Sequence, residues 1–261
     1  MNIIAMSILA GVVGMGLGGL FAALFGSRKD KMISIFLSFA GGVMISIVFF
    51  ELLPEAIEHS NIAVAVIGLV IGAAMVWVLN SLMDKLSERG KAKSKLHGTY
   101  AEFFHSDDMI SRKKSMLRSG MVMLVAIGLH NIPEGLAMGA AGVHDASLGL
   151  TLAIIIALHN IPEGMAVSAP LIAGGFSKTK AVVVTLAAGA TTLIGTIAGV
   201  LVGGISEFAV AVSFSLAGGA MLYVVIGEIF PQSIIASKDR VPTIFALAGI
   251  VVGMLFAVLI G

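Results

Sequence analysis

The sequence contains no cysteine among its 261 residues, which excludes a disulfide framework and any metal site built on thiolates. Charged residues are also scarce. They make up 12% of the chain against 58% hydrophobic residues, whereas an ordinary soluble domain is about one quarter charged. The net charge of +1 shows no excess of either sign and gives no indication of nucleic-acid binding. This composition predicts an all-α polytopic membrane protein with a single transmembrane domain over residues 1–261, rather than several soluble domains.

Long apolar runs occur throughout the chain, and each is long enough to cross about 30 Å of hydrocarbon as a helix. We expect eight transmembrane helices, at about 4–26, 33–53, 62–83, 117–140, 147–171, 180–204, 207–230 and 242–260. The first residues, MNIIAMSILAG, lack the basic segment of a cleaved signal peptide, so we expect the first run to be retained as a helix.

All 16 lysine and arginine residues lie in four connections or at the helix ends beside them. These connections follow spans 1, 3, 5 and 7, so that with eight spans they fall on one side of the membrane. The positive-inside rule makes that side cytoplasmic. We therefore expect a multi-pass protein of the cell (inner) membrane with both termini outside.

One extended polar segment interrupts the apolar pattern, at residues 84–116. It lacks a sustained apolar period, so we expect a mobile cytoplasmic loop between spans 3 and 4. His97 and His105 in this segment are either weak metal ligands or parts of a solvated connector, and the connector is the simpler interpretation.

The hexapeptide HNIPEG occurs twice, at His130–Gly135 and at His159–Gly164, in two adjacent and therefore antiparallel spans. Ionisable residues at membrane depth are costly and usually mark a substrate or ion pathway. In each copy the histidine and the glutamate are four residues apart and share one helix face. His130, Glu134, His159 and Glu163 together supply two imidazoles and two carboxylates, a ligand set suited to Zn²⁺, Fe²⁺ or Mn²⁺.

The other residues of the motif suit the same chemistry. Asn131 and Asn160 offer neutral oxygen ligands beside the histidines. Pro133 and Pro162 cannot donate a backbone hydrogen bond, so each frees a carbonyl one turn earlier in its helix. Mixed and partly neutral ligation would allow an ion to bind without being trapped, as conduction requires.

A second repeat relates spans 2 and 7, which contain AGGVMISIVFFELLP and AGGAMLYVVIGEIFP. Glu51 and Glu228 occupy the same place in the two copies, each three residues before a proline and seven residues after a methionine, Met44 or Met221. Spans 3 and 8 are related in the same way by their GxxxG pairs. Spans 2 and 7 are an odd number of spans apart, so they cross the membrane in opposite directions, and the same holds for spans 3 and 8. The pattern therefore predicts a 3+2+3 inverted repeat, which is typical of alternating-access transporters.

No lysine or arginine lies in the interior of an expected span. The four buried acids, Glu51, Glu134, Glu163 and Glu228, therefore require mobile positive charge, either a divalent metal or protons. For either methionine, core packing is the simpler role, because methionine commonly fills gaps and a thioether is a weak ligand.

These motifs resemble the ZIP (Zrt/Irt-like) family of divalent-metal transporters, and within it the bacterial zinc-uptake branch. The resemblance covers essentially the whole chain and implies a 3+2+3 helical fold, import of Zn²⁺ and related ions, and a homodimer. It also implies a binuclear centre. One site is formed by His130, Glu134, His159, Glu163 and Met44, and the other by Asn131 and Asn160, with both glutamates as bridges; Glu51 and Glu228 line the same path. Many relatives carry Glu-Pro in span 6, where this chain has Thr192-Leu193.

The function expected from the sequence is divalent-metal import by alternating access, with no resident cofactor and no enzymatic activity. A channel-like path or an exporter would use the same residues. An intramembrane metallohydrolase would need an HExxH motif, which does not occur. Two histidines without cysteine favour zinc over Cu(I), and Fe²⁺, Mn²⁺ and Cd²⁺ stay open as further substrates, as does proton coupling.

Overall fold

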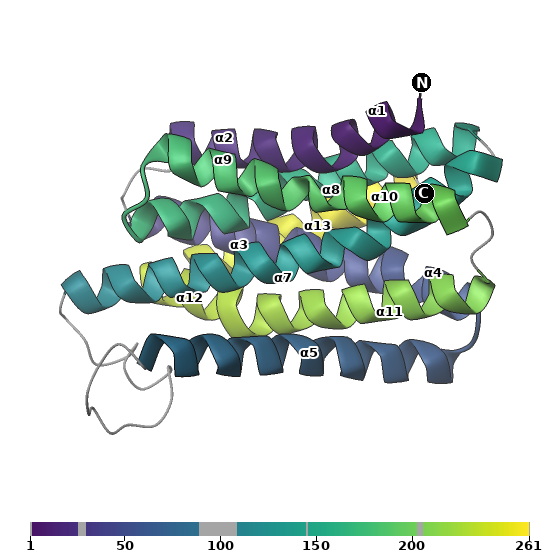
Figure 1. Cartoon of the computed structure of the whole chain (residues 1–261). Coiled ribbons are helices and arrows are strands. Elements are labelled where there is room, and N and C mark those ends of the chain that lie inside the picture. Colours follow the sequence, from purple (N-terminus) through teal and green to yellow (C-terminus); the bar gives the residue numbers. More distant parts are fainter. Residues whose placement is uncertain (1, 26–29, 89–108, 145, 203–205, 261) are drawn as a thin grey trace.

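The computed structural model describes residues 2–25, 30–88, 109–144, 146–202 and 206–260. Within these residues all regular secondary structure is helical, and eight helices are long and apolar enough to cross a membrane. The predicted all-α polytopic class is therefore confirmed. The helices run alongside one another, and the last residues of α5 lie at the same end of the bundle as the first residues of α7 (Figure 1).

Four of the eight spans are broken into shorter helices, and four are continuous. In chain order the elements are α1 (Ile3–Ser7), η1 (Ile8–Val13), α2 (Gly14–Phe25), α3 (Asp30–Ile47), η2 (Val48–Leu52), α4 (Leu53–Glu58), α5 (Ile62–Glu88), α7 (Met109–His144), α8 (Ala146–Ala173), α9 (Lys178–Gly189), α10 (Thr191–Val202), α11 (Glu207–Val224), η3 (Val225–Ile229), α12 (Phe230–Ala236) and α13 (Val241–Ile260). α5 and α7 extend into both ends of the segment 84–116. The middle of that segment, with His97 and His105, lies outside the described residues.

The π-helical turns η2 and η3 occupy equivalent places in the repeated sequences of spans 2 and 7. Each contains the repeated glutamate, and Pro54 or Pro231 follows as the second residue of the next helix. Because proline cannot donate the hydrogen bond that would continue the α-helix, the wider turn accommodates the break. The repeat in sequence is therefore also a repeat in local structure.

Glycine contacts divide the helices into two groups. In the first group, a Cβ at Gly135 of α7 would lie 2.0 Å from the carbonyl oxygen of Thr192 in α10. In the second group, a Cβ at Gly219 of α11 would lie 1.9 Å from the carbonyl oxygen of Leu69 in α5. Such distances mean that the helix backbones touch, as small residues allow in membrane bundles.

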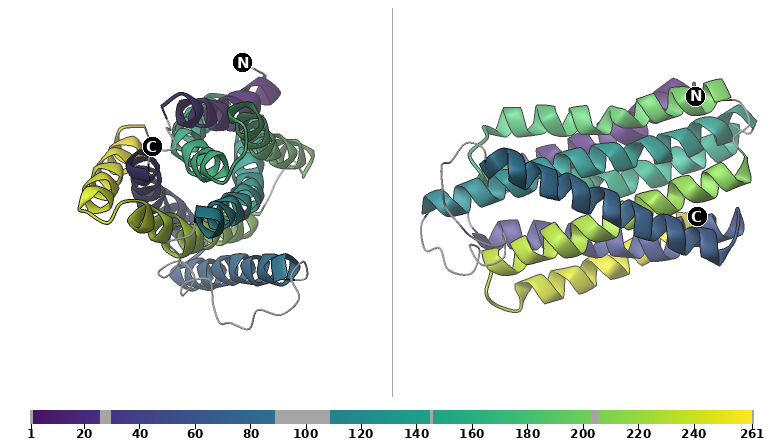
Figure 2. Two further views of the ribbon diagram at one scale, coloured as in Figure 1. Left: turned by 90° about the vertical axis from the view of Figure 1, so that its left-hand side faces the viewer. Right: turned by 60° about the horizontal axis from the view of Figure 1, so that its bottom comes forward.

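We call these the first and second helix groups. The first comprises α1–η1–α2, α7, α8 and α9–α10, and the second comprises α3–η2–α4, α5, α11–η3–α12 and α13. Each described glycine that has a close neighbour finds it within its own group. Viewed along the helices, the first group (including the teal and green helices) and the second (including the blue and yellow helices) lie on opposite sides of the bundle (Figure 2).

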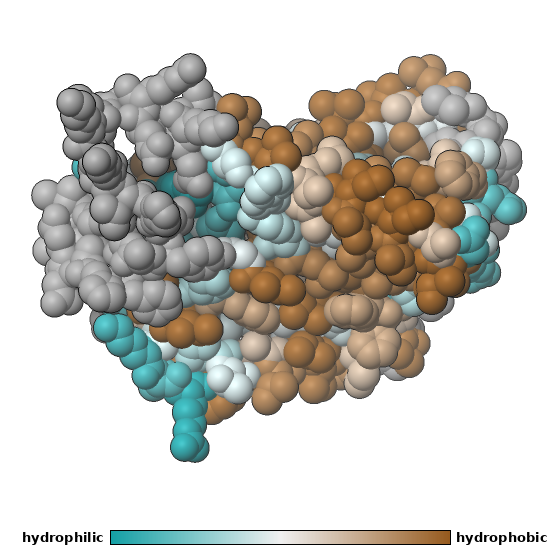
Figure 3. All heavy atoms as spheres, turned by 90° about the horizontal axis from the view of Figure 1, so that it is seen from below, coloured by the Kyte–Doolittle hydropathy of each residue, from teal (hydrophilic) through white to brown (hydrophobic). Residues whose placement is uncertain are grey.

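The outward surface is mainly apolar. Figure 3 shows hydrophobic side chains over much of one face. On α5 the side chains of Val66, Val70, Trp77 and Val78 are each more than half exposed. Large exposed apolar side chains along a whole span are what a lipid-facing helix requires, and the structure is that of a multi-pass membrane protein.

Candidate metal centre

The two HNIPEG motifs face each other across α7 and α8. Nε2 of His130 and Nε2 of His159 each lie 2.9 Å from the same oxygen, Oε1 of Glu134. Nε2 of His130 also lies 3.5 Å from Oε1 of Glu163. All four side chains are buried. The structure thus brings together the four side chains that the spacing of the motif placed on two facing helix surfaces.

This cluster lacks a fixed cation. Among the described residues, no lysine or arginine contacts either carboxylate, and both oxygens of Glu163 are without a hydrogen-bond donor. Burying carboxylates without a permanent counter-ion is costly. A divalent cation bound between the carboxylates and the imidazoles would remove that cost, and this donor set suits Zn²⁺.

The glycine of each motif holds its half-site against a neighbouring helix. Gly135, next to Glu134, packs on the backbone of α10 as described above. A Cβ at Gly164, next to Glu163, would lie 2.2 Å from the carbonyl oxygen of Met15 in α2. Pro133 and Pro162 interrupt the hydrogen bonding of α7 and α8 within the same turn. One hexapeptide therefore supplies metal ligands, a proline that leaves a helix carbonyl without its usual donor, and a glycine that anchors the helix to its neighbour.

The asparagines of the motifs are fully buried and turn their amide groups to the main chain. Nδ2 of Asn131 donates to the carbonyl of Ala188 at 3.3 Å, and Nδ2 of Asn160 donates to the carbonyl of Ala10 at 2.9 Å. Their Oδ1 atoms have no donor. Each amide is thereby held in one orientation, and a neutral acceptor oxygen remains beside each histidine.

Thr192 is the second residue of α10, which follows the break at Ala190. Its hydroxyl is buried and has no hydrogen-bond partner. One turn later, the hydroxyl of Thr196 contacts Oγ of Ser7 at 3.0 Å and donates to the carbonyl of Thr192 at 2.9 Å. The two threonines thus differ in hydrogen bonding within one buried helix face.

This difference predicts opposite effects of the same substitution. Thr192→Val is expected to leave thermal stability unchanged or slightly raised, because the lost hydroxyl has no partner. Thr196→Val removes two hydrogen bonds and should cost about 1 kcal/mol. Thermal unfolding of the two purified variants in detergent provides the comparison, and a larger loss in Thr192→Val than in Thr196→Val would contradict it.

Glu51 lies on a cavity that reaches the metal centre. The cavity has a volume of about 140 Å³, and its lining includes Glu51, Glu55, Glu134 and His159. The side chain of Glu55 is 48% exposed and contacts Nε2 of His59 at 3.4 Å. The cavity therefore connects an exposed acid at the end of span 2 with the buried ligands, and Glu51 stands between them.

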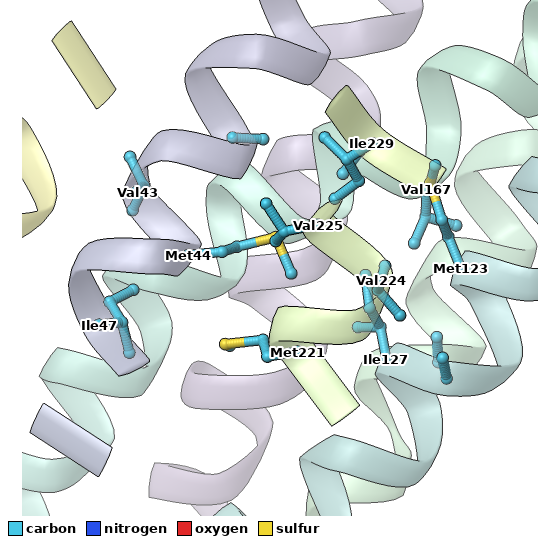
Figure 4. Close-up of a cluster of buried hydrophobic side chains, with 14 of the residues drawn as sticks. Val43, Met44, Ile47, Met123, Ile127, Val167, Met221, Val224, Val225 and Ile229 are labelled. Carbon is cyan, nitrogen blue, oxygen red and sulfur yellow. The ribbon is translucent and has the colours of Figure 1, made fainter. Parts of the chain in front are cut away.

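Met44 belongs to an apolar cluster of α3, α7, α8, α11 and η3. Figure 4 shows the members of this cluster that are labelled Val43, Met44, Ile47, Met123, Ile127, Val167, Met221, Val224, Val225 and Ile229. Along α7 the cluster precedes the first motif, and along α8 it follows the second. It therefore lies on the side of the centre where α5 connects to α7, and it closes that direction with apolar side chains.

Glu228 has partners that the sequence did not indicate. Nη1 of Arg118 lies 3.5 Å from its Oε1, Nδ2 of Asn80 donates to Oε1 at 2.8 Å, and the hydroxyl of Ser119 donates to Oε2. The expectation that buried acids have no fixed cation is therefore wrong for Glu228. The reason is the length of α7: it begins at Met109, so Arg118 lies inside the helix rather than at its end. A polar Asn80 within the apolar run of span 3 was the available signal.

Comparisons with known proteins agree with this chemistry. The family model described as ZIP Zinc transporter matches residues 80–261. The zinc transporter ZupT of Chlorobium chlorochromatii is 32% identical over 256 residues, which cover 96% of this chain and 92% of the relative. ZupT of Akkermansia muciniphila is 32% identical over 259 residues, covering 94% and 91%. The zinc transporter GufA of Myxococcus xanthus is 35% identical over 144 residues, covering 55% and 57%.

Proposed function

Because the chain belongs to the ZIP zinc transporter family, we propose that it imports divalent metal cations, zinc foremost, into the cytoplasm. The observation that carries this proposal is the shared contact of Glu134 Oε1 with both imidazoles, at 2.9 Å each. A cation placed there would be held by ligands from two antiparallel helices and by both carboxylates. The cation is the substrate, so the site has to release it as well as bind it.

We propose a binuclear centre whose second site is weaker than its first. His130, Glu134, His159 and Glu163 form the first site. The neutral oxygens of Asn131 and Asn160, with the two glutamates as bridges, form the second. The buried hydroxyl of Thr192 replaces a carboxylate there, which lowers the negative charge that attracts a second cation. Met44 lies beside the first site rather than in it, because it packs in the apolar cluster.

We propose that the two helix groups move relative to each other in alternating access. The four ligands all lie on the first group, whereas Glu51 and Phe214 on the second group line the cavity that reaches them. Rigid backbone contacts hold each group together. A shift of one group would close this cavity and separate the apolar cluster, which draws side chains from both groups.

The distribution of lysine and arginine supports an orientation with the α5–α7 connection in the cytoplasm. In that orientation the described arrangement is open outward through Glu51 and Glu55 and closed inward by the apolar cluster. Both termini then lie outside.

The homodimer implied by the family resemblance is tested by light scattering of the detergent-solubilised protein.

Zinc uptake into vesicles reconstituted with the intact protein tests the proposed function. We expect saturable uptake, reported by a trapped zinc-sensitive dye, with a steep temperature dependence. Fe²⁺, Mn²⁺ and Cd²⁺ added as competitors rank the substrates. Flux that rises linearly with zinc concentration would indicate a channel instead of a carrier. Flux no higher than that of empty vesicles would overturn the proposal of metal transport.

A further inference from the structure

A partly buried polar cluster joins the two helix groups at the end where α5 connects to α7. Arg118 and Ser119 come from α7 in the first group, and Asn80 and Glu228 come from α5 and η3 in the second. Nη2 of Arg118 donates to Oδ1 of Asn80 at 2.5 Å, in addition to the contact of Arg118 with Glu228. We call these four residues the clamp.

The clamp is built as a largely buried ion pair with added hydrogen bonds. The side chains of Arg118 and Glu228 are 16% and 6% exposed, and Asn80 bonds to both of them. Breaking one partner of such a pair leaves an uncompensated buried charge, which is strongly unfavourable. The two groups are therefore held together here by electrostatics, whereas glycine and backbone contacts hold each group together internally.

The clamp lies directly beyond the apolar cluster. Ser119 is one turn before Met123 along α7, and Glu228 is adjacent to Ile229 in η3. A cation that left the centre towards the α5–α7 connection would pass the apolar cluster and then meet Glu228. At that point it would find a carboxylate together with the oxygens of Asn80 and Ser119, which are suitable ligands for a divalent ion.

We propose that Arg118 is a positioning residue of the transport cycle, one that keeps the exit closed until the cargo arrives. Its ion pair with Glu228 holds the two helix groups together at that end. A divalent cation then replaces the guanidinium as the counter-ion of Glu228, and the groups separate there. This inference rests on the proposed function, because it assigns a role on the same ion path.

Cysteine labelling of Val225 tests the clamp without any transport measurement. Val225 is fully buried in the apolar cluster, and the native chain has no cysteine, so Val225→Cys places a single reporter there. In detergent with EDTA, a charged thiol reagent should label it slowly in the native background. Arg118→Gln should raise the labelling rate about tenfold, because a charge-assisted contact between the groups is lost.

Matched variants separate the clamp from general effects on α7. Lys114 is exposed one turn earlier on the same helix, and Lys114→Gln should leave the labelling rate unchanged. The double variant Arg118→Glu with Glu228→Arg exchanges the two charges. Its labelling rate should return to within about twofold of the native rate, because the ion pair is re-formed. Glu228→Gln removes the same pair from the other side and should match Arg118→Gln.

Native labelling rates in both Arg118→Gln and Glu228→Gln would overturn the proposal. Loss of folded, monodisperse protein in both variants would also overturn it, because the clamp is assigned to one arrangement of the groups and not to the fold. Absent zinc uptake in vesicles combined with the expected labelling pattern would reject the proposed function and leave the clamp in place as a contact that controls the arrangement.

Discussion

Glu134→Gln is expected to lower the initial rate of zinc uptake at least about a hundredfold, because even residues that only support a metal ligand cost ten- to hundredfold when they are lost. The carboxylate of Glu134 contacts both His130 and His159 through one oxygen. Glutamine keeps the volume of the side chain but removes its charge, so the protein should fold while the centre loses the negative charge of the carboxylate that both half-sites share. Uptake at sub-saturating zinc in reconstituted vesicles measures the effect.

An acid outside the centre provides the control. Glu207 is exposed in the first turn of α11, and Glu207→Gln should leave zinc uptake within the error of the measurement. Glu163→Gln should behave like Glu134→Gln, since Glu163 is buried in the same cluster. A residue that only supports a metal ligand already costs about tenfold or more when it is lost. Uptake by Glu134→Gln within about threefold of the native protein would therefore remove Glu134 from the centre.

Gly135→Ala is expected to have the largest effect on stability of any single methyl addition in α7. The new Cβ would lie 2.0 Å from the carbonyl oxygen of Thr192 and 3.0 Å from the backbone nitrogen of Thr196. Because backbone atoms cannot move aside as a flexible side chain can, α7 and α10 must separate. Overpacking of this kind typically costs about 1–3 kcal/mol. Thermal unfolding in detergent should show the loss as a lower midpoint temperature.

Gly128 in the same helix is the matched control. A Cβ at Gly128 would have its nearest neighbour at 3.8 Å, an ordinary contact, so Gly128→Ala should be neutral or stabilising. Zinc uptake should fall with Gly135→Ala as well, because the neighbouring Glu134 moves with its helix. Equal unfolding temperatures for the two variants would contradict the direct backbone contact between α7 and α10.

Much of this architecture could be predicted from the sequence because the membrane imposes simple rules. The eight spans follow from the lengths of the apolar runs and from the one-sided placement of lysine and arginine. The convergence of the two HNIPEG motifs follows from helical spacing and from the antiparallel order of adjacent spans. The repeat between spans 2 and 7 indicated equivalent local structures, and η2 and η3 have them.

Other features depend on tertiary contacts that spacing does not encode. The sequence showed many glycines but not which helix each one touches, so the two helix groups were not predicted. The partners of Glu228 were missed because they are distant in sequence: Asn80 and Ser119 lie 148 and 109 residues from Glu228 in the chain. The orientation of the Asn131 and Asn160 amides depends on carbonyls from α9 and η1, which only the fold brings near.

The position of bound zinc tests the central claim most directly. Crystals of the native protein soaked with Zn²⁺ and measured at the zinc absorption edge should show an anomalous peak between α7 and α8. We expect this peak about 2.0–2.1 Å from Nε2 of His130 and of His159, with a carboxylate oxygen of Glu134 or Glu163 completing the site. Anomalous peaks only at exposed residues such as His59, with none between the two motifs, would contradict the account.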